Sequence, residues 1–138
     1  MKKLHGLTID VEIYKDEIPV FYGDPDLMFQ WGTNKYGETF RGEFSQVKGA
    51  SAYCFICDPV GYRIPAFIYL GRTKRNWGNI AHEVLHYSMF LLAHRNVGID
   101  PEEVEGHEAL TYLVGWIIEK IQKTPFKEYN FKKKKWIK

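Results

Sequence analysis

The order of hydrophobic and polar residues predicts strands in the first part of the chain. From Leu7 to Ile13 apolar and polar residues alternate strictly, which is the period of a strand with one buried side. A strand is therefore expected over residues 5–14, with residues 18–22 as its partner.

A break after this pattern indicates the first helix. Asp24 followed by Pro25 is a favourable helix start, because the aspartate can cap the first turn and proline fits its first position. We therefore expect a short helix over residues 25–34. Residues 32–49 are rich in Gly, Lys and Glu and are expected to form a long loop or an irregular ribbon.

Two β-rich runs, 50–57 and 62–70, flank a turn sequence. The segment Asp58-Pro59-Val60-Gly61 between them has the residues that a type I turn favours, so the two runs are expected to form a hairpin. Pro65 indicates an edge position for the second strand, because proline cannot donate to the hydrogen-bond ladder.

Helical periodicity dominates the second half. Asn76 is a candidate cap for a helix over about 77–95, which Asn96-Val97-Gly98 ends. Asp100-Pro101 is a strong restart, so a second helix is expected over about 101–123.

These elements predict one α+β domain over residues 1–138, a small antiparallel sheet packed on two long helices. Its expected parts are mostly strands and loops over 1–70, a first long helix over 76–96, a second over 101–123 and a basic aromatic tail over 124–138.

Composition narrows the class of protein. The chain of 138 residues is 45% hydrophobic and 16% aromatic, which suffices for a core without disulfides. Nineteen basic and 17 acidic residues give a net charge of only +2, too balanced to indicate a nucleic-acid binder. No signal sequence or long apolar run is present and there are only two cysteines, so we expect a cytoplasmic protein that does not span a membrane.

The segment His82-Glu83-Val84-Leu85-His86 carries the strongest chemical signal. One helical turn takes about 3.6 residues, so His82 and His86 leave the same side of a helix and can hold one ion. Glu83 lies roughly 100° around the helix, where it can reach a water bound to that ion. This arrangement is typical of a zinc hydrolase. The alternative is a core helix whose histidines bond to backbone carbonyl groups, but burying these three polar groups without partners is costly.

A metal site of this kind needs a third protein ligand, for which the second long helix offers candidates. They are Glu102, Glu103, Glu105, His107 and Glu108. The helix start explains the first two. His107 lies in an apolar arc of its helix. This position favours a histidine that faces the core or hydrogen-bonds to a metal ligand, and it disfavours His107 as the metal ligand.

Small residues on the two helices favour Glu108. At ~100° per residue, Glu108 shares a face with Gly115, and Gly78 and Ala93 share the face of the histidine pair. We therefore expect the helices to approach closely there and to leave room for an ion.

The histidine motif, followed by Glu108-Ala109-Leu110-Thr111-Tyr112-Leu113-Val114-Gly115-Trp116, resembles metallopeptidases encoded in phages and prophages, which are similar to small gluzincins. The resemblance covers about residues 62–122 and implies a minimal zincin-like fold in a bacterial or phage-infected cell. It also implies one Zn²⁺ ion with Glu108 as the third ligand. The chain departs from the gluzincin pattern at Tyr112, where an aspartate is common, and at Asn79 and Ser88.

The chemistry of such a site assigns the remaining roles. The zinc would lower the pKa of its water towards ~7, and Glu83 would take the proton and deliver it to the leaving amine of a peptide or protein substrate. By the same resemblance, a strand before the metal helix would pair with the substrate. Its residues are Ala66, Phe67, Ile68, Tyr69 and Leu70. The candidates for stabilising the oxyanion are Tyr69, Tyr87, His94 and Tyr112.

Weaker signals define the competing hypotheses. Cys54 and Cys57 stand three apart in a predicted strand and would point to opposite faces, which favours structural thiols over a redox or second metal site. Lysines 132–135 suit a solvated tail or, as an alternative function, a nucleic-acid contact. The other alternative is a non-catalytic domain in which zinc stabilises a protein-interaction surface. The oligomeric state is not indicated.

Overall fold

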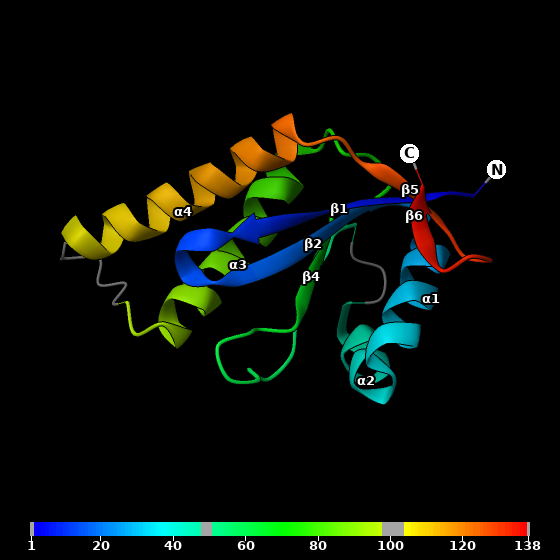
Figure 1. The fold of residues 1–138 in the computed structure, drawn as a ribbon, viewed down its shortest axis with the longest axis horizontal. Coiled ribbons are helices and arrows are strands. Elements are labelled where there is room, and N and C mark those ends of the chain that lie inside the picture. The colour runs from blue at the N-terminus through cyan, green and yellow to red at the C-terminus, as the bar shows by residue number, and fades with distance from the viewer. Residues whose placement is uncertain (1, 48–50, 98–103, 138) are drawn as a thin grey trace.

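The chain forms a six-stranded sheet with helices on both sides, so the α+β prediction is confirmed (Figure 1). The computed structural model describes residues 2–47, 51–97 and 104–137, with the side chains of 45–47 and 104–107 excepted. In chain order the strands are β1 (Leu4–Val11), β2 (Asp16–Gly23), β3 (Tyr53–Ile56), β4 (Ala66–Tyr69), β5 (Lys127–Asn130) and β6 (Lys135–Ile137), with a 3₁₀ turn, η1 (Glu12–Tyr14), between β1 and β2. The helices are α1 (Pro25–Tyr36), α2 (Glu38–Val47), α3 (Trp77–His94) and α4 (Val104–Lys123).

The strands lie in the order β3-β4-β2-β1-β5-β6. Neighbouring strands are antiparallel except β2 and β4, which run parallel with Val20 opposite Ile68. The β1–β2 and β3–β4 hairpins were both expected. The parallel pair follows from the insertion of α1, α2 and β3 between β2 and β4, because parallel strands need a long connection.

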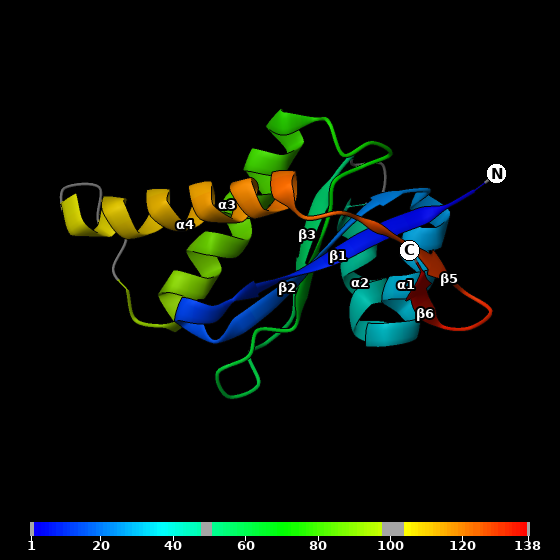
Figure 2. The same ribbon diagram turned by 45° about the horizontal axis from the view of Figure 1, so that its top comes forward.

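Two hydrophobic cores lie on opposite faces of the sheet, as the helices in Figures 1 and 2 show. Alternation along β4 explains the division, since successive side chains point to opposite faces. Ile68 packs in the core beneath α3 and α4, whereas Phe67 and Tyr69 pack in an aromatic core with Phe40 of α2. The site-bearing helices therefore cover one face only.

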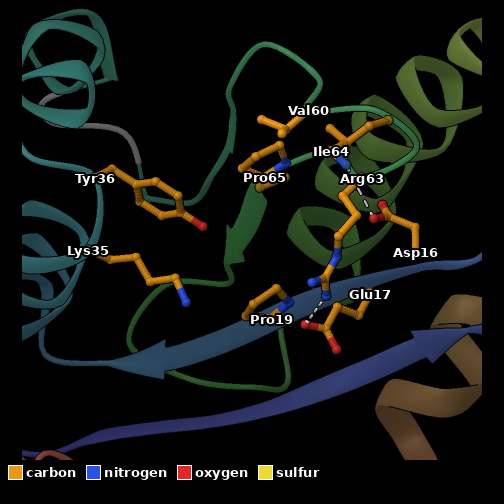
Figure 3. Close-up of a pocket in the computed structure, with 10 residues that line it drawn as sticks. Asp16, Glu17, Pro19, Lys35, Tyr36, Val60, Arg63, Ile64 and Pro65 are labelled. Carbon is orange, nitrogen blue, oxygen red and sulfur yellow. Dashed lines mark hydrogen bonds and ion pairs between the residues drawn. The ribbon is translucent and has the colours of Figure 1, made fainter.

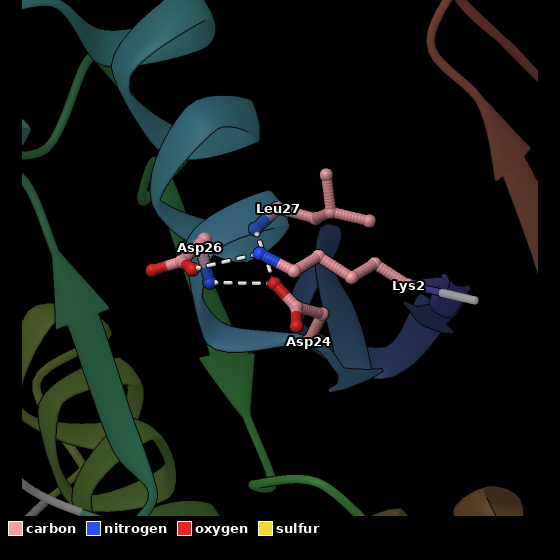
Figure 4. Close-up of polar contacts among 4 residues, drawn as sticks. All are labelled: Lys2, Asp24, Asp26 and Leu27. Atoms are coloured by element: carbon pink, nitrogen blue, oxygen red, sulfur yellow. Dashed lines mark hydrogen bonds and ion pairs between the residues drawn. The ribbon is translucent and has the colours of Figure 1, made fainter.

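The cap at the start of α1 is the one predicted. Asp24 Oδ1 accepts hydrogen bonds from the backbone N–H groups of Asp26 (2.9 Å) and Leu27 (3.2 Å), and Lys2 forms an exposed ion pair with Asp26 (Figure 4). These bonds satisfy donors that a helix start leaves unpaired.

The expectation of a loop over residues 32–49 is wrong for residues 32–47, and residues 48–49 lie outside the described part of the chain. Helix α1 continues to Tyr36, Gly37 interrupts it with φ +61°, and α2 follows at once. Phe40 and Phe44 stand one helical turn apart and both pack in the aromatic core. Tertiary burial of these two rings therefore outweighs the polar composition of the segment.

The β3–β4 hairpin has its turn two residues later than expected. Val60 and Arg63 exchange backbone hydrogen bonds across Gly61 and Tyr62, and Gly61 has φ +63°. A left-handed glycine at the first central position is typical of a type II′ turn. Strand β4 pairs with both β3 and β2, so it is not an edge strand as a whole. Its pairing with β2 is at Ile68 and Tyr69, three and four residues after Pro65.

The C-terminal segment belongs to the sheet. Strand β5 pairs with β1, β6 pairs with β5, and the Trp136 ring stacks on Phe21 at 5.6 Å. Lysines 132–135 are exposed, as predicted for a solvated segment, but they lie in a paired hairpin and not in a loose tail. The predicted helix start at Asp100-Pro101 lies outside the described residues. Among the described helices, none has the length and apolar character needed to cross a bilayer.

Candidate metal centre

Helix α3 has one buried and one exposed face, and the motif histidines lie on the exposed one. The Asn76 side chain caps the helix by accepting from Asn79 N–H at 3.1 Å, as predicted. On the buried face of α3, the side chains of Ile80, Val84 and Leu91 are fully buried. Both histidines are solvent-exposed, so a ligand can reach them without rearrangement of the core.

The two imidazoles converge as a shared ion requires. Nε2 of His82 and Nε2 of His86 lie 3.1 Å apart, with the ring planes at 78°. Two nitrogens bound at about 2.0–2.1 Å to one tetrahedral ion lie about 3.3 Å apart, close to this separation. The helix thus presents a preformed two-nitrogen chelate.

Glu83 completes a group that could hold a metal ion. Its carboxylate and the ligand atoms of the two histidines all lie within 4.8 Å of one another. Glu83 is only 6% exposed, and burial raises the pKa of its carboxyl group against the opposing effect of His82 and His86. An acid held beside two exposed histidines can exchange a proton with a water between them.

Glu83 lies on α3, which is in contact with strand β3. Burial is the main cause that raises the pKa of the Cys54 thiol, and the negative charge of Glu83 is the second cause. Cys54 lies on the face of the sheet that α3 covers. Strand β3 is the outermost strand of the sheet beside α3. The helix that carries the acid and the histidine pair therefore lies beside the outermost strand β3.

A buried polar pair that the sequence did not reveal anchors the helix to the sheet. Asp16, 5% exposed, accepts a 2.5 Å hydrogen bond from Tyr87 Oη and a 3.3 Å bond from Ile64 N–H. Tyr87 follows His86 directly, so this contact fixes the rotation of α3 at the site. Asp16 follows a turn in the sequence, where aspartate is common, and no local signal distinguishes it.

Glu108 is not part of the described metal group. Its side chain is exposed on α4, and the group comprises His82, Glu83 and His86 alone among the described residues. The His107 side chain lies outside the described residues, and Tyr112 is 65% exposed. The role of Glu108 as third ligand therefore stays a prediction.

The argument that small residues bring the helices together at the site is wrong. A Cβ atom added at Gly115 would meet no atom within 4 Å, so this glycine faces open space. Gly78 and Ala93 are exposed as well. Helices α3 and α4 instead pack through larger apolar residues such as Leu92 and Leu113.

The predicted substrate strand is in the wrong place. Residues Ala66–Tyr69 form β4, whose backbone is paired with β3 on one side and β2 on the other. An added strand needs unpaired backbone groups, and among the described strands β3 is paired on one side only, by β4. The free edge beside Glu83 is therefore Tyr53–Ile56.

Three of the four candidates for oxyanion stabilisation already have partners. Tyr69 Oη donates to Gly23 O, Tyr87 Oη donates to Asp16, and His94 Nε2 contacts Gly61 O at 2.9 Å. Tyr112 has no such hydrogen bond within the described part of the chain, and its role stays a prediction.

Cys54 and Cys57 are free thiols that pack in the two cores on opposite faces of the sheet, as their spacing predicted. Burial is the main cause that raises the pKa of both thiols. Burial therefore favours the protonated thiol, which is the weaker nucleophile, at both positions.

Three kinds of comparison with known proteins gave no match. No family model, curated protein or solved structure matches it. The inference of function therefore depends on the geometry of His82, Glu83 and His86.

Proposed function

We propose that this protein is a metal-dependent peptidase in which His82 and His86 hold a zinc ion and Glu83 is the general base. The observation that carries the proposal is the 3.1 Å convergence of two solvent-exposed imidazole nitrogens beside a buried carboxylate. When bound, the ion would supply an acidified water and polarise a substrate carbonyl group.

The chain's own residues account for the remaining steps. Glu83, within 4.8 Å of both histidines, would accept a proton from the water and donate it to the leaving amine. The open edge of β3 would bind an extended peptide through backbone hydrogen bonds, so the substrate is proposed to be a peptide or an unfolded protein segment.

Exposure of the histidines favours catalysis over a structural role for the metal. Structural zinc sites are closed by four protein ligands, whereas catalytic sites keep a position for water. His82 and His86 are both exposed, and their surroundings among the described residues supply only one further ligand group, Glu83. We retain Glu108 as the proposed third protein ligand, on the resemblance to gluzincins alone.

Metal analysis of purified variants tests the ligand assignment. His82→Ala and His86→Ala are expected to lose stoichiometric zinc or cobalt, because each removes half of the chelate. His94→Ala is the matched control, since His94 lies on the same helix and contacts Gly61 O instead. Loss of metal from Glu108→Ala but not from His107→Ala would support Glu108, and the reverse would replace it.

Turnover of a quenched fluorescent casein tests the base. Glu83→Gln is expected to retain the metal and to lose at least ~100-fold in kcat, the usual contribution of general base catalysis. Wild-type turnover in Glu83→Gln would exclude Glu83 as the base. Metal-loaded wild-type protein that cleaves no peptide would overturn the peptidase proposal while leaving the metal site intact.

A further inference from the structure

A cavity of about 240 Å³ lies between the C-terminal end of α1, the start of β2 and the loop before β4 (Figure 3). We call it the Lys35–Arg63 pocket. Its apolar wall includes Pro19, Ile64 and Pro65, and its polar side chains include Lys35, Tyr36 and Arg63. None of these residues belongs to the metal group, so the pocket is a separate feature of the molecule.

Two hydrogen-bond donors from α1 point into the pocket without partners of their own. Figure 3 shows the Lys35 ammonium and the Tyr36 hydroxyl directed at the space in front of Pro19 and Pro65. Within the described part of the chain, Lys35 makes no ion pair and Tyr36 Oη makes no hydrogen bond. The Lys35 ammonium contacts only the Trp31 ring, at 5.7 Å.

Packing fixes the position of the Tyr36 hydroxyl. Its ring packs against Phe55 at 5.0 Å and Phe67 at 5.9 Å in the aromatic core. Burial, with a smaller contribution from Cys57, raises the pKa of Tyr36 to about 12, so the hydroxyl keeps its proton at neutral pH. Tyr36 is therefore a preoriented donor.

Arg63 supplies further donors on the other side of the pocket. One guanidinium nitrogen bonds Glu17 at 2.7 Å, which orients the group but uses few of its five N–H donors. Asp16 also lines the pocket, and its two oxygens accept hydrogen bonds from Tyr87 and Ile64. Two cationic side chains, Lys35 and Arg63, and two carboxylates, Asp16 and Glu17, therefore line the pocket, so their formal charges cancel.

We propose that the Lys35–Arg63 pocket binds a small monocarboxylate with an apolar body. The carboxylate accepts hydrogen bonds from Lys35 Nζ, Tyr36 Oη and the Arg63 guanidinium, and the body packs against Pro19 and Pro65. One carboxylate can accept from all three donors, whereas a phosphate dianion would be repelled by both Asp16 and Glu17. The volume lies just below the ~300–1,000 Å³ typical of pockets for drug-sized ligands, which restricts the ligand to a small acid.

Titration with 3-phenylpropionate, followed by two-dimensional ¹H–¹⁵N NMR of the full-length protein, tests this binding. We expect saturable shifts of the backbone amides of Tyr36, Arg63 and Ile64. The neutral amide 3-phenylpropionamide has the same body and is expected to bind at least about tenfold more weakly, because hydrogen bonds to a charged group contribute more. No saturable shift with the acid, or equal binding of acid and amide, would overturn the proposal.

Conservative variants locate the binding site. Lys35→Met is expected to weaken 3-phenylpropionate binding about tenfold and Tyr36→Phe about threefold, since one loses a charged and the other a neutral donor. Lys133→Met, in the exposed β5–β6 turn, and His82→Ala are expected to change nothing. Unchanged affinity in both pocket variants, or inorganic phosphate binding at the same amides as tightly as the acid, would refute the proposed ligand class.

Discussion

At the scale of single residues, the site depends on a polar group that packing has removed from solvent. Asp16 is buried at the start of β2, and it can stay there because Tyr87 Oη and Ile64 N–H both donate to it. A buried carboxyl group without such partners would be strongly destabilising. Since Tyr87 adjoins His86, the same contact that stabilises the core also orients the metal-binding face of α3.

Removing the Tyr87 hydroxyl should therefore lower the free energy of unfolding more than removing the hydroxyl of another hydrogen-bonded tyrosine. Tyr87→Phe is expected to lower the free energy of unfolding by about 2 kcal/mol, because a hydrogen bond to a buried charged group is lost. Tyr69→Phe, which loses a 2.7 Å bond to the neutral Gly23 carbonyl, is expected to cost about 1 kcal/mol. Urea unfolding measures both, and equal losses would show that Asp16 gains nothing special from Tyr87.

At the scale of elements, α3 carries the candidate site and packs on both the sheet and α4. The buried face of α3 packs on the sheet and on α4, and its histidines project from the opposite face. Glu83 lies at the boundary of the two faces, which is why it is buried while its motif partners are exposed. The exposed face of α4, with Gly115, takes no part in the contact between the helices.

Two helix-interior glycines should respond oppositely to the same substitution. Gly115→Ala is expected to stabilise the protein by about 0.5–1 kcal/mol, because the methyl group enters open space and glycine is a poor helix former. Gly32→Ala is expected to destabilise it by about 1–3 kcal/mol, since the new Cβ would lie 2.5 Å from Cε1 of the buried Phe40 ring.

Thermal unfolding of the two glycine variants compares them directly. A destabilised Gly115→Ala protein would indicate that α4 packs more closely there than the structure shows. In that case the close helix approach first expected from the sequence would be correct.

At the scale of the whole molecule, the sheet separates two cores and two candidate sites. Helices α3 and α4 cover one face and α1 and α2 cover the other (Figure 1). The histidine pair lies on α3, and α1 ends at the Lys35–Arg63 pocket. The aromatic core on the second face holds tyrosines whose hydroxyl groups are poorly solvated. Their ionisation affects the stability of the whole fold.

The protein should lose stability in alkali. Burial is the main cause that raises the pKa of both Tyr36 and Tyr69 to about 12, from 10.0 for an unperturbed tyrosine. Between these values the unfolded chain has released protons that the folded chain still holds, so stability should fall as pH rises from about 10 towards 12. Below pH 10 these groups should contribute no pH dependence.

Urea midpoints at pH 8, 10 and 11 measure this effect. The Tyr36→Phe/Tyr69→Phe double variant should lose less stability between pH 10 and 11 than wild type does. An identical alkaline loss in the double variant would assign the effect to other groups.

Local patterns in the sequence were sufficient to predict several strands and helices. Alternation from Leu7 to Ile13 identified the first strand, and the caps Asp24 and Asn76 identified two helix starts. The spacing of His82 and His86 placed both on one side of α3, because helical geometry alone determines the relation between residues four apart. These features depend on neighbours in the chain, so the sequence by itself determined them.

Contacts between distant segments decided the rest. Burial of Phe40 and Phe44 made a polar stretch helical, and pairing of β5 with β1 made a strand of a lysine-rich end. Strand order placed β3, rather than β4, at the free edge beside Glu83. The pairing of Asp16 with Tyr87 and the convergence on the Lys35–Arg63 pocket also join residues far apart in sequence, and only packing in three dimensions sets which of them meet.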